Sequence, residues 1–169
     1  MAKQTLIKLL YEMMKNSKRS DRDLAKIIGV SQPTITRTRK KLEKMGYIKE
    51  YTVIPDMTKL GIEIIAFTFL NLIKHPPKGS STTKNYDDLL KWLETNQNVI
   101  LLAVGNGLNG KNRVMITVHR DFTEYSDFIS DLRSEWATCL MDVDTFLIST
   151  KGRTLKPFSF KYLENIKKN

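Results

Sequence analysis

Apolar residues recur at helical spacing over the first third of the chain. Between residues 2 and 14 they fall at Leu6, Leu9, Leu10, Met13 and Met14, which lie on one side of a helix. Two shorter amphipathic stretches follow within residues 20–46. The pattern therefore predicts three helices, the first of which supports the other two.

Residues 20–46 contain the start and stop signals of two helices joined by a tight turn. Ser20 is a good N-cap for the first helix, and Gly29 suits the left-handed conformation that follows many helices. Ser31 is a second N-cap, and Pro33 fits the first turn of the second helix. This arrangement predicts a helix-turn-helix, a motif that places its second helix in the major groove of DNA.

The predicted second helix has an apolar face and a basic face at 100° per residue. The apolar positions of the two helices are Leu24, Ala25, Ile27, Ile28, Ile35, Leu42 and Met45, with Thr38 among them. The candidate DNA-binding residues are Ser31, Gln32, Thr34, Thr36, Arg37, Arg39, Lys40, Lys41 and Lys44. Arg37 is the best candidate for a guanine contact, because its planar fork matches O6 and N7. The lysines are candidates for phosphate contacts. A solvated basic helix in an ordinary bundle is the alternative.

From residue 62 the pattern changes to alternating strands and helices. Strands are predicted over residues 62–73, 99–104, 114–118 and 140–148, and helices over residues 86–93 and 125–136. The order β-α-β-β-α-β predicts a ferredoxin-like sheet in an α+β fold. Right-handed crossovers place both helices on one side of that sheet. The other face is also apolar, so we expect a homodimer that packs sheet to sheet.

These elements predict an organisation of two domains with a linker and an extension. Residues 1–50 form the DNA-binding domain, residues 51–61 a hinge strand and linker, and residues 62–150 the dimerisation and effector domain. The run YIKEYTVI that ends at Ile54 predicts a wing or hinge strand, and residues 74–84 a polar loop. Residues 151–169 form a basic extension in which aromatic residues stand at alternate positions, namely Phe158, Phe160 and Tyr162. We expect these residues to pack at a sheet edge or to add a strand to a neighbouring subunit.

Charge strengthens the prediction of a DNA partner. The 169 residues have a formal net charge of +10 and are 41% hydrophobic, which is enough for a folded core. Residues 1–51 hold 13 Lys and Arg against 5 Asp and Glu, whereas residues 52–150 have a slight acidic excess. A basic excess concentrated in the predicted helix-turn-helix fits a polyanion.

Other features narrow the class of protein. The apolar stretches are far shorter than the ~20 residues of a membrane span, and Lys8 and Glu12 interrupt the first, so we expect no signal peptide. The one cysteine, Cys139, forms no intrachain disulfide framework and has no companion at metal-ligand spacing. We expect a cytoplasmic, nucleoid-associated protein without metal or cofactor.

The chain resembles the Lrp/AsnC family of transcription regulators. The resemblance covers residues 3–150 and is carried by LAKIIGVSQPTITRTRKKLEKMGYIKEYTVI followed by the βαββαβ order. It implies dimers that assemble further into tetramers or octamers, partly symmetric DNA sites and, in many members, an amino-acid effector. A Gly-Asp pair typical of effector-binding members corresponds here to the loop Gly105, Asn106 and Gly107. The amide of Asn106 does not pair with an ammonium group as a carboxylate does.

The sequence favours a sequence-specific DNA-binding regulator that is not an enzyme. One alternative is an architectural protein that binds DNA with little sequence preference. The other is a family-related enzyme such as a haem-precursor decarboxylase, for which His75 and His119 are the only histidines available. For both histidines a structural or surface role is the simpler interpretation.

Overall fold

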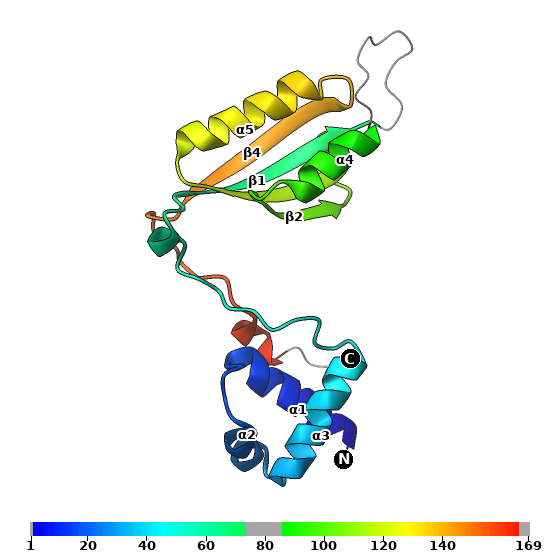
Figure 1. Ribbon diagram of the computed structural model, residues 1–169, viewed down its shortest axis with the longest axis vertical. Helices are drawn as coiled ribbons and strands as arrows, with labels where there is room; N and C mark the ends of the chain where they lie inside the picture. Colours follow the sequence, from blue (N-terminus) through cyan, green and yellow to red (C-terminus); the bar gives the residue numbers. More distant parts are fainter. Residues whose placement is uncertain (1, 74–85, 166–169) are drawn as a thin grey trace. The chain divides into compact units, whose positions relative to one another are not determined.

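A computed structural model describes residues 2–73 and 86–165, which form parts of two compact units (Figure 1). The first unit combines Met1–Ile54 with Lys156–Asn169, and the second comprises Pro55–Leu155. The predicted loop at residues 74–84, which includes His75, lies outside the described residues.

The first unit is built on three helices, α1 (Ala2–Lys15), α2 (Asp21–Ile28) and α3 (Gln32–Lys44). All three were predicted, and their apolar faces meet in one core. The buried members of that core are Leu6, Leu9, Met13, Leu24, Ala25, Ile35 and Leu42. Two predicted core residues are exposed instead: Ile27, on the outer side of α2, and Met45, which caps the end of α3.

The segment after α3 differs from the prediction. Residues 47–54 form no strand, so the predicted hinge strand is wrong for the described chain. The backbone N–H groups of Tyr47 and Ile48 instead donate to the Leu42 carbonyl oxygen, and the residues beyond them run without a strand partner. A strand needs a hydrogen-bonded neighbour, which β-branched composition alone does not supply.

The C-terminal extension returns to the first unit. Among its described residues, 151–165, the 3-10 helix η3 (Phe160–Asn165) packs against α1. Phe158 and Phe160 meet edge to face, with their ring centroids 5.2 Å apart. The extension therefore contacts a helix of the first unit rather than a sheet edge, and Phe158, Phe160 and Tyr162 remain 71%, 56% and 40% exposed.

The second unit is a four-stranded sheet with two helices, and the βαββαβ order is confirmed. Its elements are η1 (Met57–Leu60), β1 (Ile64–Leu72), α4 (Tyr86–Thr95), β2 (Val99–Val104), η2 (Leu108–Gly110), β3 (Arg113–His119), α5 (Phe122–Glu135) and β4 (Leu140–Ser149). The strand order is β2-β3-β1-β4, and every neighbouring pair is antiparallel. This is the ferredoxin-like topology, with both crossover helices on one face of the sheet (Figure 1).

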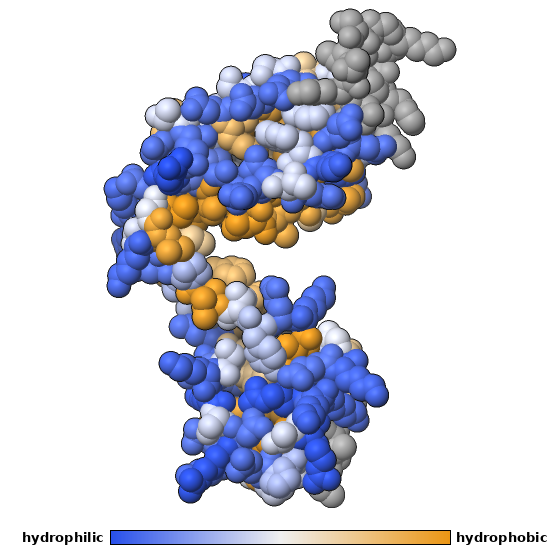
Figure 2. Space-filling model, viewed as in Figure 1, coloured by the Kyte–Doolittle hydropathy of each residue, from blue (hydrophilic) through white to orange (hydrophobic). Residues whose placement is uncertain are grey.

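The two faces of this sheet differ in what covers them. The face under α4 and α5 is buried and includes Leu70 and Met115, together with the helix residues Leu89 and Leu132. Alternate residues point to the other side, where Figure 2 shows apolar side chains gathered along the sheet. On that open face Phe67 of β1 lies opposite Phe146 of β4, which is 66% exposed.

Candidate nucleic-acid interface

The turn between α2 and α3 has the geometry that the sequence predicted. Ser20 caps α2, its hydroxyl accepting a hydrogen bond from the Asp23 N–H at 3.1 Å. Gly29 ends the helix at φ 79°, in the left-handed region that glycine enters without strain. Val30 and Ser31 complete the turn, so that α3 begins three residues after Gly29.

The start of α3 is fixed by its own side chains. Ser31 is the N-cap; its hydroxyl oxygen accepts from the Thr34 N–H at 3.4 Å and lies 2.8 Å from the Thr34 hydroxyl. Pro33 occupies the first turn, where a missing N–H costs nothing. On the inner side of α3, Ile35 and Leu42 are fully buried. Burial of these two residues orients the opposite side of the helix towards solvent.

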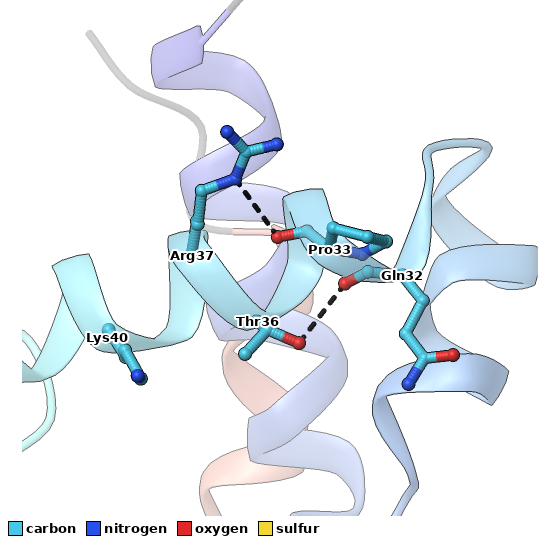
Figure 3. A pocket seen from close by; sticks show the side chains of 5 residues that line it. All are labelled: Gln32, Pro33, Thr36, Arg37 and Lys40. Atoms are coloured by element: carbon cyan, nitrogen blue, oxygen red, sulfur yellow. Dashed lines mark hydrogen bonds between the residues drawn. The ribbon is translucent and has the colours of Figure 1, made fainter.

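The exposed side of α3 forms an open depression lined by Gln32, Pro33, Thr36, Arg37 and Lys40. Figure 3 shows the Arg37 guanidinium and the Gln32 amide extending on opposite sides of the helix, with Pro33 and Thr36 between them. Arg37 Nε donates to the Pro33 carbonyl oxygen at 3.3 Å, which steadies the side chain while its terminal nitrogens point away from the helix. The structure thus brings together donors suited to base edges and a lysine suited to phosphate.

The remaining candidate residues divide into two groups. Ser31, Lys41 and Lys44 are exposed, whereas Thr34 and Thr36 are partly buried. The Thr36 hydroxyl lies 2.7 Å from Asp21 Oδ2 and 3.2 Å from the Gln32 carbonyl oxygen, so its proton is held within the protein. Its oxygen retains acceptor capacity only.

Arg39 lies apart from the other cations of α3. Its Nε and one terminal nitrogen donate to Asp21 Oδ1 at 2.9 and 2.6 Å, and both side chains are 20% exposed. Burial alone would raise the pKa of Asp21, but hydrogen bonds from Thr36 and Arg39 lower it below its ordinary value. Asp21 was not among the residues singled out from the sequence, because nothing local relates it to a position 18 residues later.

The predicted effector loop is exposed at Gly105, Asn106 and Gly107. Two backbone hydrogen bonds shape it, from the Gly105 N–H to the Asn112 carbonyl oxygen at 3.1 Å and from the Gly107 N–H to the Lys111 carbonyl oxygen at 2.7 Å. A Cβ atom at Gly107 would lie 3.1 Å from Lys111 Cβ, so the chain packs closely at this glycine. The Lys111 side chain itself is buried and pairs with Asp142 and Asp144.

The other sequence candidates take structural positions. His119 is fully buried at the end of β3, with Nε2 2.8 Å from the Thr117 hydroxyl. Cys139 is also buried. Within residues 2–73 and 86–165, no group of three or more His, Cys, Asp or Glu side chains could hold a metal ion. None of the helices described in these ranges is long and apolar enough to span a bilayer.

Comparison with known proteins relates the first 49 residues to a DNA-binding family. Residues 3–49 match the family described as winged helix-turn-helix DNA-binding. The transcriptional regulator AzlB of Bacillus subtilis is 29% identical over 150 residues, which cover 87% of this chain and 88% of AzlB.

Solved structures match the fold over both units. The structure of E. coli AsnC matches with a TM-score of 0.69 and 19% identity, covering 94% of this chain and 97% of AsnC. The transcriptional regulator NMB0573 of Neisseria meningitidis, solved as a complex with L-Met, matches with a TM-score of 0.75 and 16% identity, covering 93% of each chain.

Proposed function

We propose that the chain is a helix-turn-helix transcription regulator of the Lrp/AsnC type that reads specific DNA sites by placing α3 in the major groove. The observation that carries this proposal is the exposed surface at the start of α3, where Gln32, Arg37 and Lys40 surround one open depression. In a helix-turn-helix, the residues near the start of the second helix are those that reach base edges.

The proposed roles follow from exposure and chemistry. Arg37 contacts a guanine through its terminal nitrogens, and Gln32 is suited to bidentate recognition of an adenine. Lys40, Lys41 and Lys44 neutralise phosphates. Ser31, Thr34 and Thr36 lie near the helix start, where they approach bases or backbone.

A second copy of the chain completes the proposed regulator. The open sheet face displays Phe69, Leu101 and Phe146 to solvent, all at least 40% exposed. Burying this face against its copy would produce a homodimer with two reading heads, and further assembly would give a tetramer or octamer. Each dimer would then contact half-sites about 34 Å apart, one turn of the double helix, or a multiple of that spacing.

Effector binding is a separate part of the proposal. The L-Met complex of NMB0573 shows a protein of this fold with an amino acid bound. We propose that the loop Gly105–Gly107 takes part in binding a small effector here, with Asn106 offering an amide rather than a carboxylate. The site of action is the DNA of the cytoplasm and its nucleoid, and the chain acts as a regulator rather than as an enzyme.

The basic charge of the first unit also supports an architectural protein that binds DNA with little sequence preference. The deciding experiment must distinguish such binding from sequence-specific binding. The experiment is binding to genomic fragments, including the promoter of the chain's own gene, at two salt concentrations with excess competitor DNA. A discrete fragment that survives competition and high salt is the expected result. Uniform binding that disappears with salt would identify an architectural protein, and absence of binding would overturn both roles.

A further inference from the structure

We propose that Arg39 is a positioning residue, which fixes the orientation of α3 through Asp21, while the hydrogen bond from Tyr51 to Glu43 joins the chain segment beyond the helix to α3. This inference rests on the proposed reading of DNA by α3. It assigns Arg39, a candidate DNA contact by sequence, a different task from that of its neighbours.

The first support is the number of elements that one guanidinium reaches. From α3, Arg39 donates twice to Asp21 at the start of α2, and its third nitrogen lies 3.6 Å from the Met13 sulfur of α1. Asp21 in turn accepts from Thr36 on the exposed side of α3. The planar guanidinium presents several N–H donors in a fixed fork and can therefore contact both neighbours at once. A lysine ammonium is a compact point charge without this fork.

The second support is the link to the segment after α3. The Tyr51 hydroxyl donates to Glu43 Oε1 at 2.7 Å, and Glu43 belongs to the last turns of α3. Tyr51 stands four residues before Pro55, where the sheet unit begins. In the described structure the run between Tyr51 and Ile54 forms no helix or strand. The phenol therefore joins this segment to α3 by a side-chain hydrogen bond.

The third support is the contrast with the neighbouring cations. The Arg39 side chain is only 20% exposed and its guanidinium is held by protein groups, whereas Arg37 and Lys40 are exposed on the depression. Releasing Arg39 to a phosphate would leave the Asp21 carboxylate, itself 20% exposed, without its cationic partner. Because base readout needs side chains within a few tenths of an ångström of their targets, a small tilt of α3 would reduce selectivity before it reduced affinity.

The test compares five variants on the fragment selected by the wild-type protein and on a scrambled duplex of equal length; the fifth, Arg39→Gln, removes the charge of Arg39. Arg39→Lys keeps the charge but not the fork, Tyr51→Phe removes one hydroxyl, Asp21→Asn removes the carboxylate charge, and Lys40→Gln is the control for phosphate binding. We expect the first three to reduce the ratio of specific to non-specific affinity about tenfold, with an unchanged dependence of log K on log salt. Lys40→Gln should lower the salt slope by about 0.9 and leave the ratio nearly intact.

Thermal unfolding of each variant separates positioning from loss of fold, because Tyr51→Phe removes only the hydroxyl of a half-exposed residue and should retain the wild-type midpoint. A ratio that stays at the wild-type value in both Tyr51→Phe and Arg39→Lys would overturn the positioning role. So would an Arg39→Gln variant whose salt slope falls as in Lys40→Gln, since Arg39 would then bind phosphate. If the wild-type protein selects no fragment, that result overturns the proposed sequence-specific DNA binding, and the positioning role of Arg39 is overturned with it.

Discussion

The backbone N–H of Gly29 donates to the Ala25 carbonyl oxygen at 2.9 Å, and this bond closes α2 with Gly29 at φ 79°. An L side chain at this position would be strained by about 1–2 kcal/mol. The turn between the two helices of the motif therefore requires a residue that adopts the left-handed conformation without strain, which glycine does.

We expect Gly29→Ala to lower the free energy of unfolding of the DNA-binding unit by about 1–2 kcal/mol, because the left-handed conformation disfavours a Cβ atom. Urea denaturation followed by circular dichroism measures the change. Gly105→Ala is the matched control, since Gly105 has no positive φ and open space where its Cβ would lie. Equal stability of the two variants would show that the turn is not held in the left-handed conformation.

Arg37→Ala should weaken binding to the selected DNA site by about 1–3 kcal/mol and relax the preference at one base pair, because a bidentate guanine contact is lost. Competition binding against single-base variants of the site measures both effects. Lys44→Ala serves for comparison, since losing an exposed phosphate-binding lysine weakens binding to all sequences alike. A uniform loss in Arg37→Ala, with unchanged sequence preference, would assign Arg37 to the phosphate backbone.

Phe146→Asp should convert the proposed homodimer into a monomer, because it introduces a charge into the open apolar sheet face, opposite Phe67. Size-exclusion chromatography with light scattering gives the mass directly. Phe122→Asp is the control: Phe122 is similarly exposed, at 61%, but it starts α5. Dissociation by both variants, or by neither, would contradict a dimer formed through this sheet face.

Local signals explain why the helix-turn-helix could be predicted from the sequence so closely. Ser20, Gly29 and Ser31 act within four residues of their own positions, so the caps and the turn can be recognised without tertiary information. The alternation in β3 and the helical spacing in α4 are equally local. Each of these elements lies where its pattern predicts it, within the usual uncertainty at the ends.

Contacts distant in sequence account for what could not be predicted. Arg39 and Asp21 are 18 residues apart, so the sequence pattern placed Arg39 on the flank of a basic face although tertiary structure holds it inside. The return of η3 to α1 joins the two ends of the chain, and no composition signal indicates which surface an aromatic tail will cover. Residues 47–54 have strand-forming composition, but a strand forms only where another segment offers its backbone groups.

Acidification should destabilise the sheet unit through His119. Burial lowers the pKa of this imidazole, an effect only partly offset by the Glu124 carboxylate, which also pairs with Arg120. The unfolded chain, with an ordinary histidine pKa of about 6.5, therefore takes up a proton at a higher pH than the folded protein does. Stability is fully present above that pH and declines as the pH falls towards the folded pKa, by no more than about 1.4 kcal/mol per pH unit for one proton.

Urea unfolding of wild type and His119→Gln at pH 7.5, 6.5, 5.5 and 5.0 isolates this proton, because the carboxylates titrate alike in both proteins. Glutamine keeps polar atoms near the Thr117 hydroxyl and Asn98, the two hydrogen-bonding neighbours of the imidazole ring, but takes up no proton. We expect the variant to be less stable than wild type at pH 7.5 and the difference to narrow as the pH falls. A gap of constant size across this range would mean that His119 binds protons equally in the folded and unfolded chains, so that its burial has no influence on the acid sensitivity of the sheet unit.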